Sequence, residues 1–134
     1  MIKNKFLRVL SFFTFPAIIF ILNYTLLDIF NVYSLFPWVD IPMHFLGGFS
    51  IAYMTTLFIR FFKEEKLLKI NNYLVFVLIV VSVVGLTAVL WEFWEFIVDY
   101  FFNLNWQPSL NDTILDLFMG LLGGFSFAIF QKKY

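Results

Sequence analysis

Long apolar runs separated by three short connections make up most of the chain. Residues 6–27, 40–62, 73–101 and 112–130 each form such a run. About 20 apolar residues in a helix suffice to cross the roughly 30 Å hydrocarbon core of a bilayer. The pattern therefore predicts an all-α polytopic membrane bundle of four transmembrane helices, in a single domain that covers residues 1–134.

Prolines and capping residues refine these four segments. Pro16 lies inside the first segment and predicts a kink there. Asn111 and Asp112 are residue types that favour a helix N-cap, so they predict where the fourth helix begins. The first apolar run is too long for a signal peptide, and no small-residue cleavage pattern follows it. We therefore expect it to be a transmembrane helix.

The composition supports a membrane protein. Hydrophobic residues make up 62% of the chain and charged residues 13%, against roughly 45–50% and about 25% in soluble domains. The absence of cysteine excludes disulfides and thiol chemistry. No basic stripe accompanies a soluble surface, so nucleic-acid binding is not expected.

Basic residues mark only one side of the four-helix arrangement. The nine of them are Lys3, Lys5, Arg8, Arg60, Lys63, Lys66, Lys69, Lys132 and Lys133. They lie before or at the start of the first segment, after the last segment, or around the connection between the second and third. Because Lys and Arg are enriched on the cytoplasmic side of membrane proteins, both termini are predicted to be cytoplasmic.

Acidic residues have the opposite distribution. Seven of the nine fall at the other ends of the segments: Asp28, Asp40, Glu92, Glu95, Asp99, Asp112 and Asp116. The only histidine, His44, follows Asp40 by four residues and so shares its helical face. The same spacing rule places the three acids of the third segment on one face, and the two of the fourth segment on another. We expect these stripes to converge at the extracytoplasmic side of the cell membrane.

Such a cluster needs compensation, because charges within a membrane are costly and usually pair. Three outcomes are open: several carboxylates are protonated, they bind a metal ion, or they bind a cationic ligand. Carboxylates with one imidazole suit a divalent metal ion, and helical bundles build such sites from facing helices. The predicted metal ligands are Asp40, His44, Glu92, Glu95, Asp112 and Asp116, with Glu92 or Glu95 as catalytic general base. For His44 alone, a hydrogen-bonded core histidine is the simpler interpretation.

Tryptophan and glycine accompany the acidic residues. Trp38, Trp91, Trp94 and Trp106 all map to the acidic side, where they suit an interfacial aromatic belt or a wall for a cationic ligand. The glycines below His44 and Asp116 favour close helix packing, and a cleft for a lipid chain is the alternative.

Several motifs resemble known membrane families. Asp40-Ile-Pro-Met-His44-Phe-Leu-Gly-Gly resembles the D-x-x-x-H-F-x-G opening of the VanZ-like proteins, and Asn111-Asp112-Thr-Ile-Leu-Asp116 resembles their final helix. Trp91-Glu92-Phe-Trp-Glu95 and Asp112-Thr-x-x-Asp116 are closer still to the YjdF-like inner-membrane proteins. VanZ-like proteins commonly have Gln after the third-helix Glu, where this chain has Glu95. The resemblance therefore implies site residues and no particular reaction.

Three functions follow from these observations. The first is a metal-dependent hydrolase or transferase that acts on lipid or lipid-linked head groups, where the metal activates water or polarises a phosphoryl oxygen. The second is a protein that binds or transports cations. The third is a non-catalytic membrane factor, so the sequence leaves open whether the chain is an enzyme.

Overall fold

The computed structural model describes residues 2–131, without the side chains of residues 2, 3, 27 and 28. The predictions for Lys3, the side chain of Asp28, Lys132 and Lys133 thus lie outside the described part. Within it, every regular element is helical and no strand occurs, which confirms the all-α fold.

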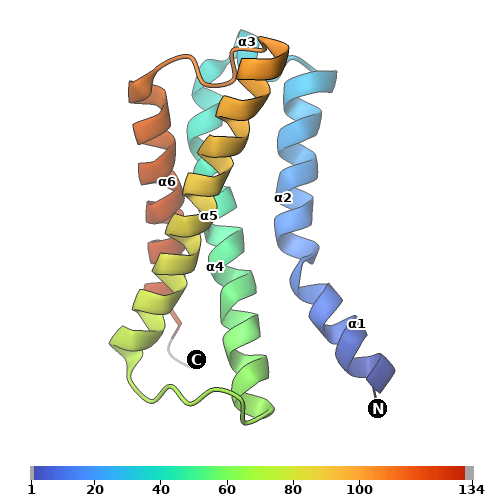
Figure 1. Cartoon of the computed structure of the whole chain (residues 1–134), viewed down its shortest axis with the longest axis vertical. Coiled ribbons are helices and arrows are strands. Elements are labelled where there is room, and N and C mark those ends of the chain that lie inside the picture. Colours follow the sequence, from blue (N-terminus) through green and yellow to red (C-terminus); the bar gives the residue numbers. More distant parts are fainter. Residues whose placement is uncertain (1, 132–134) are drawn as a thin grey trace.

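Eight helical elements follow one another along the chain (Figure 1). They are α1 (Ile2–Phe12), α2 (Thr14–Tyr24), the π-helical turn η1 (Thr25–Ile29), α3 (Val32–Leu35), the 3₁₀ turn η2 (Pro37–Val39), α4 (Asp40–Glu64), α5 (Tyr73–Phe102) and α6 (Leu110–Ile129). In the described residues, α4 with the turn before it, α5 and α6 are long and apolar enough to span a membrane. The α1–α2 pair counts as a fourth span if the bent pair crosses as one, so the fold has three to four candidate spans.

The predicted kink of the first span is present, but it lies one turn before Pro16. α1 and α2 meet at 41° around Phe13. A proline ring clashes with the carbonyl four residues earlier and leaves it without its usual amide partner. For Pro16 that carbonyl belongs to Phe12, the last residue of α1, which explains why the helix breaks there.

Glycines bring α4 and α6 into close contact, as predicted. A Cβ atom on Gly48 would lie 1.9 Å from the carbonyl oxygen of Gly120, and one on Gly123 would lie 2.0 Å from that of Phe45. Such approach is possible only between backbones without side chains, as in small-residue contacts between membrane helices. Gly47 differs, because a Cβ there would meet no atom within 4 Å.

The two ends of the bundle differ in charge. The basic end carries the N-terminus and residues 65–72, and the acidic end carries α3 and residues 103–109 (Figure 1). At the basic end, Lys5 Nζ lies 2.5 Å from Glu65 Oε2, and Arg8 pairs with Glu64. These pairs neutralise the two acids on that side and tie α1 to the end of α4.

The predicted N-cap of the fourth helix is wrong by two to three residues. The cap is Ser109, whose hydroxyl oxygen accepts a hydrogen bond from the Asp112 amide at 3.2 Å. Asp112 lies in the first turn of α6, where its charge suits the helix dipole.

Candidate functional site

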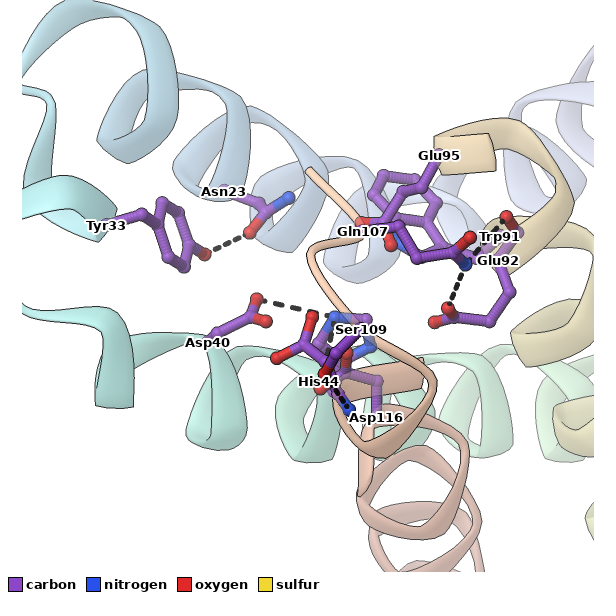
Figure 2. A network of polar contacts seen from close by, with 11 residues as sticks. Asn23, Tyr33, Asp40, His44, Trp91, Glu92, Glu95, Gln107, Ser109 and Asp116 are labelled. Carbon is purple, nitrogen blue, oxygen red and sulfur yellow. Dashed lines mark hydrogen bonds and ion pairs between the residues drawn. The ribbon is translucent and has the colours of Figure 1, made fainter. Parts of the chain in front are cut away.

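Side chains from α4 and α6 meet at the acidic end around His44 (Figure 2). Asp40 and His44 lie one turn apart on α4, and the His44 Nε2 atom is 3.4 Å from Asp40 Oδ1. The same nitrogen is 3.8 Å from Oδ1 of Asp116, which α6 contributes. One ligand atom from each of the three residues lies within 4.8 Å of the other two.

A second group shares the same histidine. Glu92 and Glu95 extend from successive turns of α5, and one carboxylate oxygen of each lies within 4.8 Å of a His44 nitrogen. His44 therefore stands between the carboxylates of α4 and α6 and those of α5. Three helices distant in sequence contribute to one polar centre.

This centre is buried and strongly acidic. Glu92, Glu95 and Asp116 are only 5%, 7% and 3% exposed. Residues 9–59 and 70–131 contain no Lys or Arg, so no basic side chain other than His44 belongs to these segments. Burying carboxylates without a cation costs free energy, and this group of acids therefore suits a bound cation.

Neutral donors hold the two glutamates of α5 in place. The indole Nε1 of Trp91 donates to Glu95 Oε1 at 2.8 Å, and the Gln107 side-chain amide donates to Glu92 Oε2 at 2.9 Å. Hydrogen bonds of this kind fix the orientation of carboxylates around a site. They do so without supplying the positive charge that the cluster lacks.

The position of Gln107 depends on Asp99. Asp99 accepts hydrogen bonds from the backbone amides of Trp106 and Gln107, at 2.7 and 2.8 Å. The loop between α5 and α6 turns with Asn103 and Asn105 at positive φ, a conformation that asparagine tolerates. Asp99 is thus a support for the loop, and through Gln107 it helps to place Glu92.

A polar pair covers the side of the site toward α2. The Tyr33 hydroxyl of α3 donates to Oδ1 of Asn23 on α2 (Figure 2). Burial raises the pKa of the Tyr33 hydroxyl above its ordinary value, and the negative charges of Asp40 and Glu95 raise it further. Tyr33 is therefore a neutral donor at the rim of the acidic centre.

Five of the six predicted ligands come together in this way. Asp112 belongs to neither ligand group, although it is close enough to Asp40 and His44 to interact with their charges. For all six residues, the role as a metal ligand stays a prediction.

Sequence reasoning missed the contacts of Tyr33, Asn23 and Gln107. Gln107 is one of four polar residues in the loop 103–109, and nothing in its spacing indicates Glu92 as its partner.

The tryptophans divide into two kinds. Trp38 and Trp94 are 65% and 52% exposed, which suits the interfacial belt. Trp91 instead bonds Glu95 and packs edge-on against Phe20 of α2, with ring centres 5.9 Å apart. Trp91 therefore belongs to the site and joins α5 to α2.

The distances around His44 resemble those between metal ligands. In a tetrahedral site with bonds of ~2.0–2.2 Å, neighbouring ligand atoms lie roughly 3.3–3.6 Å apart. The 3.4 Å separation from Asp40 fits this range, and the 3.8 Å separation from Asp116 exceeds it by a few tenths of an ångström. Both are long for direct hydrogen bonds, which favour about 2.7–3.2 Å.

Comparison with known proteins places the chain among small membrane proteins. No solved structure matches it. It is 33% identical over 110 residues to a Thermotoga maritima protein described only as uncharacterized, in an alignment that covers 77% of this chain. The alignment covers 53% of the relative, so the chain spans about half the length of the curated relative it matches. A family model described as a predicted membrane protein matches residues 3–134, and the chain therefore belongs to this family, DUF2238.

Proposed function

We propose that this protein binds a divalent metal ion at its acidic end and uses it for hydrolysis or group transfer on lipid head groups. The observation that carries the proposal is the convergence of Asp40, Asp116, Glu92 and Glu95 on one histidine. A divalent ion would neutralise part of a charge for which residues 9–59 and 70–131 offer no Lys or Arg.

The residues divide naturally between two roles. Asp40, His44 and Asp116 supply three O and N ligands, and catalytic metal sites commonly use three protein ligands and keep one position for water. When bound, a divalent ion would acidify that water and polarise a phosphoryl oxygen. Glu92 and Glu95 face His44 from α5, and either can take up a proton as general base.

The first experiment measures metal content. The full chain, purified in detergent, is treated with chelator, dialysed against Zn²⁺ or Mn²⁺, and analysed by mass spectrometry. We expect one ion per chain, and affinity weaker by about 100-fold or more in Asp116→Asn and His44→Gln, since even outer-shell changes cost roughly 10–100-fold. Glu64→Gln is the matched control, because it removes an acid at the basic end. Absence of binding, or equal binding in all variants, would overturn the metal proposal.

A second experiment separates binding from catalysis. Release of head groups from phospholipid in mixed micelles is followed for the metal-loaded protein and for Glu92→Gln and Glu95→Gln. The variant that lacks the general base should turn over about 10²-fold or more slowly while its metal stays bound. Metal binding without turnover in the unmodified protein would instead favour a non-catalytic membrane factor.

Transport of cations through the bundle is the weaker alternative. Away from Asn23, His44 and Trp91 at its polar end, the space between the helices is lined by apolar residues and by the hydroxyl groups of Ser50 and Thr87. Ions or protons crossing a membrane need a chain of polar or ionisable groups. Binding of an organic cation without metal would revive this alternative.

A further inference from the structure

An elongated cavity of about 520 Å³ lies directly below the acidic centre. Its lining residues come from between Phe13 and Asn23 at α2, between Met43 and Ile51 of α4, between Val84 and Trp91 of α5, and from Gly120 of α6. At 1.5 Å per residue, the ten-residue advance along the first span corresponds to roughly 15 Å, about half of a bilayer's hydrocarbon thickness. Its volume falls within the roughly 300–1,000 Å³ of ligand pockets.

The walls of this cavity are apolar in effect. The few hydroxyl groups among the lining residues donate within their own helices: Ser50 to the Gly47 carbonyl and Thr87 to the Val83 carbonyl, both at 2.8 Å. The cavity is partly open to the surface of the bundle, and apolar spaces do not hold water well. The space therefore suits hydrocarbon, which the surrounding bilayer supplies.

One end of the cavity is polar, and it is the acidic centre itself. Asn23, His44 and Trp91 all line the cavity, and each also contacts another residue of the centre (Figure 2). A molecule that fills the space must therefore combine a long apolar body with a polar group at the carboxylates and His44. A membrane lipid aligned with the helices has this shape.

Gly47 gives independent evidence that close helix packing does not account for the cavity. Its neighbour Gly48 cannot accept a side chain, because α6 lies against it, whereas a Cβ on Gly47 would enter open space. Gly47 lines the cavity, so the missing side chain widens it without bringing two helices together.

We infer that this cavity holds one acyl chain of a phospholipid, whose phosphate lies at the acidic centre and is bound there through the metal ion. The role of the metal rests on the proposed function, because uncompensated carboxylates would repel a phosphate. The acyl chain needs only the apolar cavity. The cavity thus identifies the substrate class as a lipid held by its chain.

Trp91 provides the readout. In a variant with Trp38, Trp94 and Trp106 changed to Phe, a brominated lysophospholipid added to detergent micelles should quench Trp91 fluorescence in a saturable way. Gly47→Leu fills the cavity and should raise the lipid concentration at half-saturation by about tenfold or more, equivalent to at least 1.4 kcal/mol of binding free energy. Ser82→Leu is the matched control, because Ser82 is exposed on α5 and does not line the cavity. Metal content and thermal unfolding of each variant confirm that the fold and the centre are intact.

A brominated monoacylglycerol, which has no phosphate, separates the chain from the head group. Both lipids should bind in the unmodified protein, and only the phosphate lipid should bind more tightly with metal and lose that gain in Asp116→Asn. Equal quenching in Gly47→Leu and Ser82→Leu would overturn the inference even if the metal binds. Equal affinity of the phosphate lipid with and without metal would overturn the head-group part of the inference. Failure of the proposed metal centre would appear separately, as absence of metal from the purified protein.

Discussion

Two adjacent glycines of α4 allow a stringent test of how the site is held together. Gly47→Ala and Gly48→Ala make the same chemical change in the same helix, and each gains about 0.5–1 kcal/mol from replacing glycine within a helix. This gain cancels when the two variants are compared. The difference in their unfolding free energies therefore reports the surroundings of the added methyl group alone.

Those surroundings differ sharply. At Gly48 the new Cβ would lie 1.9 Å from the Gly120 carbonyl oxygen, whereas ordinary contact begins at 3.4 Å. The helix backbones must separate by about 1.5 Å, and overpacking of this kind costs roughly 1–3 kcal/mol. At Gly47 nothing opposes the methyl group. We expect Gly48→Ala to be less stable than Gly47→Ala by about 1–3 kcal/mol, toward the upper end because backbone atoms cannot rotate away.

The assay is unfolding in mixed micelles with increasing SDS, followed by tryptophan fluorescence. Metal affinity measured on the same samples adds a second criterion, because separation of α4 from α6 moves Asp116 away from His44. Gly48→Ala should weaken metal binding, and Gly47→Ala should leave it unchanged. Equal stability of the two variants would refute the close α4–α6 contact as the feature that sets the site.

Three further predictions concern the loop, the rim and the orientation of the protein. Asp99→Asn keeps the shape of the side chain but removes its charge and one acceptor, and it should lower the unfolding free energy by roughly 1–3 kcal/mol. Hydrogen exchange of the amides of residues 106 and 107 should become faster, and unchanged exchange would contradict this explanation. Burial and nearby negative charge raise the pKa of Tyr33 in the folded protein, so the neutral hydroxyl is favoured. The contribution of Tyr33 to folding stability is therefore complete below the unfolded pKa of about 10, and it is lost as pH rises through the folded pKa. The tyrosinate absorbance that is present in the unmodified protein and absent from Tyr33→Phe belongs to Tyr33, and it should titrate above pH 10. Titration at or below pH 10 would refute a buried Tyr33 beside negative charges. A fluorescent protein fused after Tyr134 should fold and fluoresce in the cytoplasm, whereas an active alkaline phosphatase fusion at the same point would reverse the predicted orientation.

The fold class and the bounds of α4 and α5 follow from the amino-acid sequence alone. The predicted 40–62 and 73–101 segments differ from α4 and α5 by no more than two residues at either end. Hydropathy succeeds here because the bilayer acts on each helix separately, through the length of its apolar run. The separation of basic from acidic residues is likewise visible along the chain, and so is the Asp40–His44 pair, since an i,i+4 relation is internal to one helix.

Packing between helices settles which acids meet and which glycines lie against another backbone. Asp112 and Asp116 share a face of α6, yet only Asp116 joins His44 in a ligand group. Gly47 and Gly48 are adjacent in sequence and both line the cavity, yet a Cβ atom would enter open space at Gly47 and collide with the Gly120 backbone at Gly48. These outcomes depend on the rotation and axial register of each helix against its neighbours. Periodicity within one helix cannot fix them, because they arise from the shapes that two surfaces present to each other.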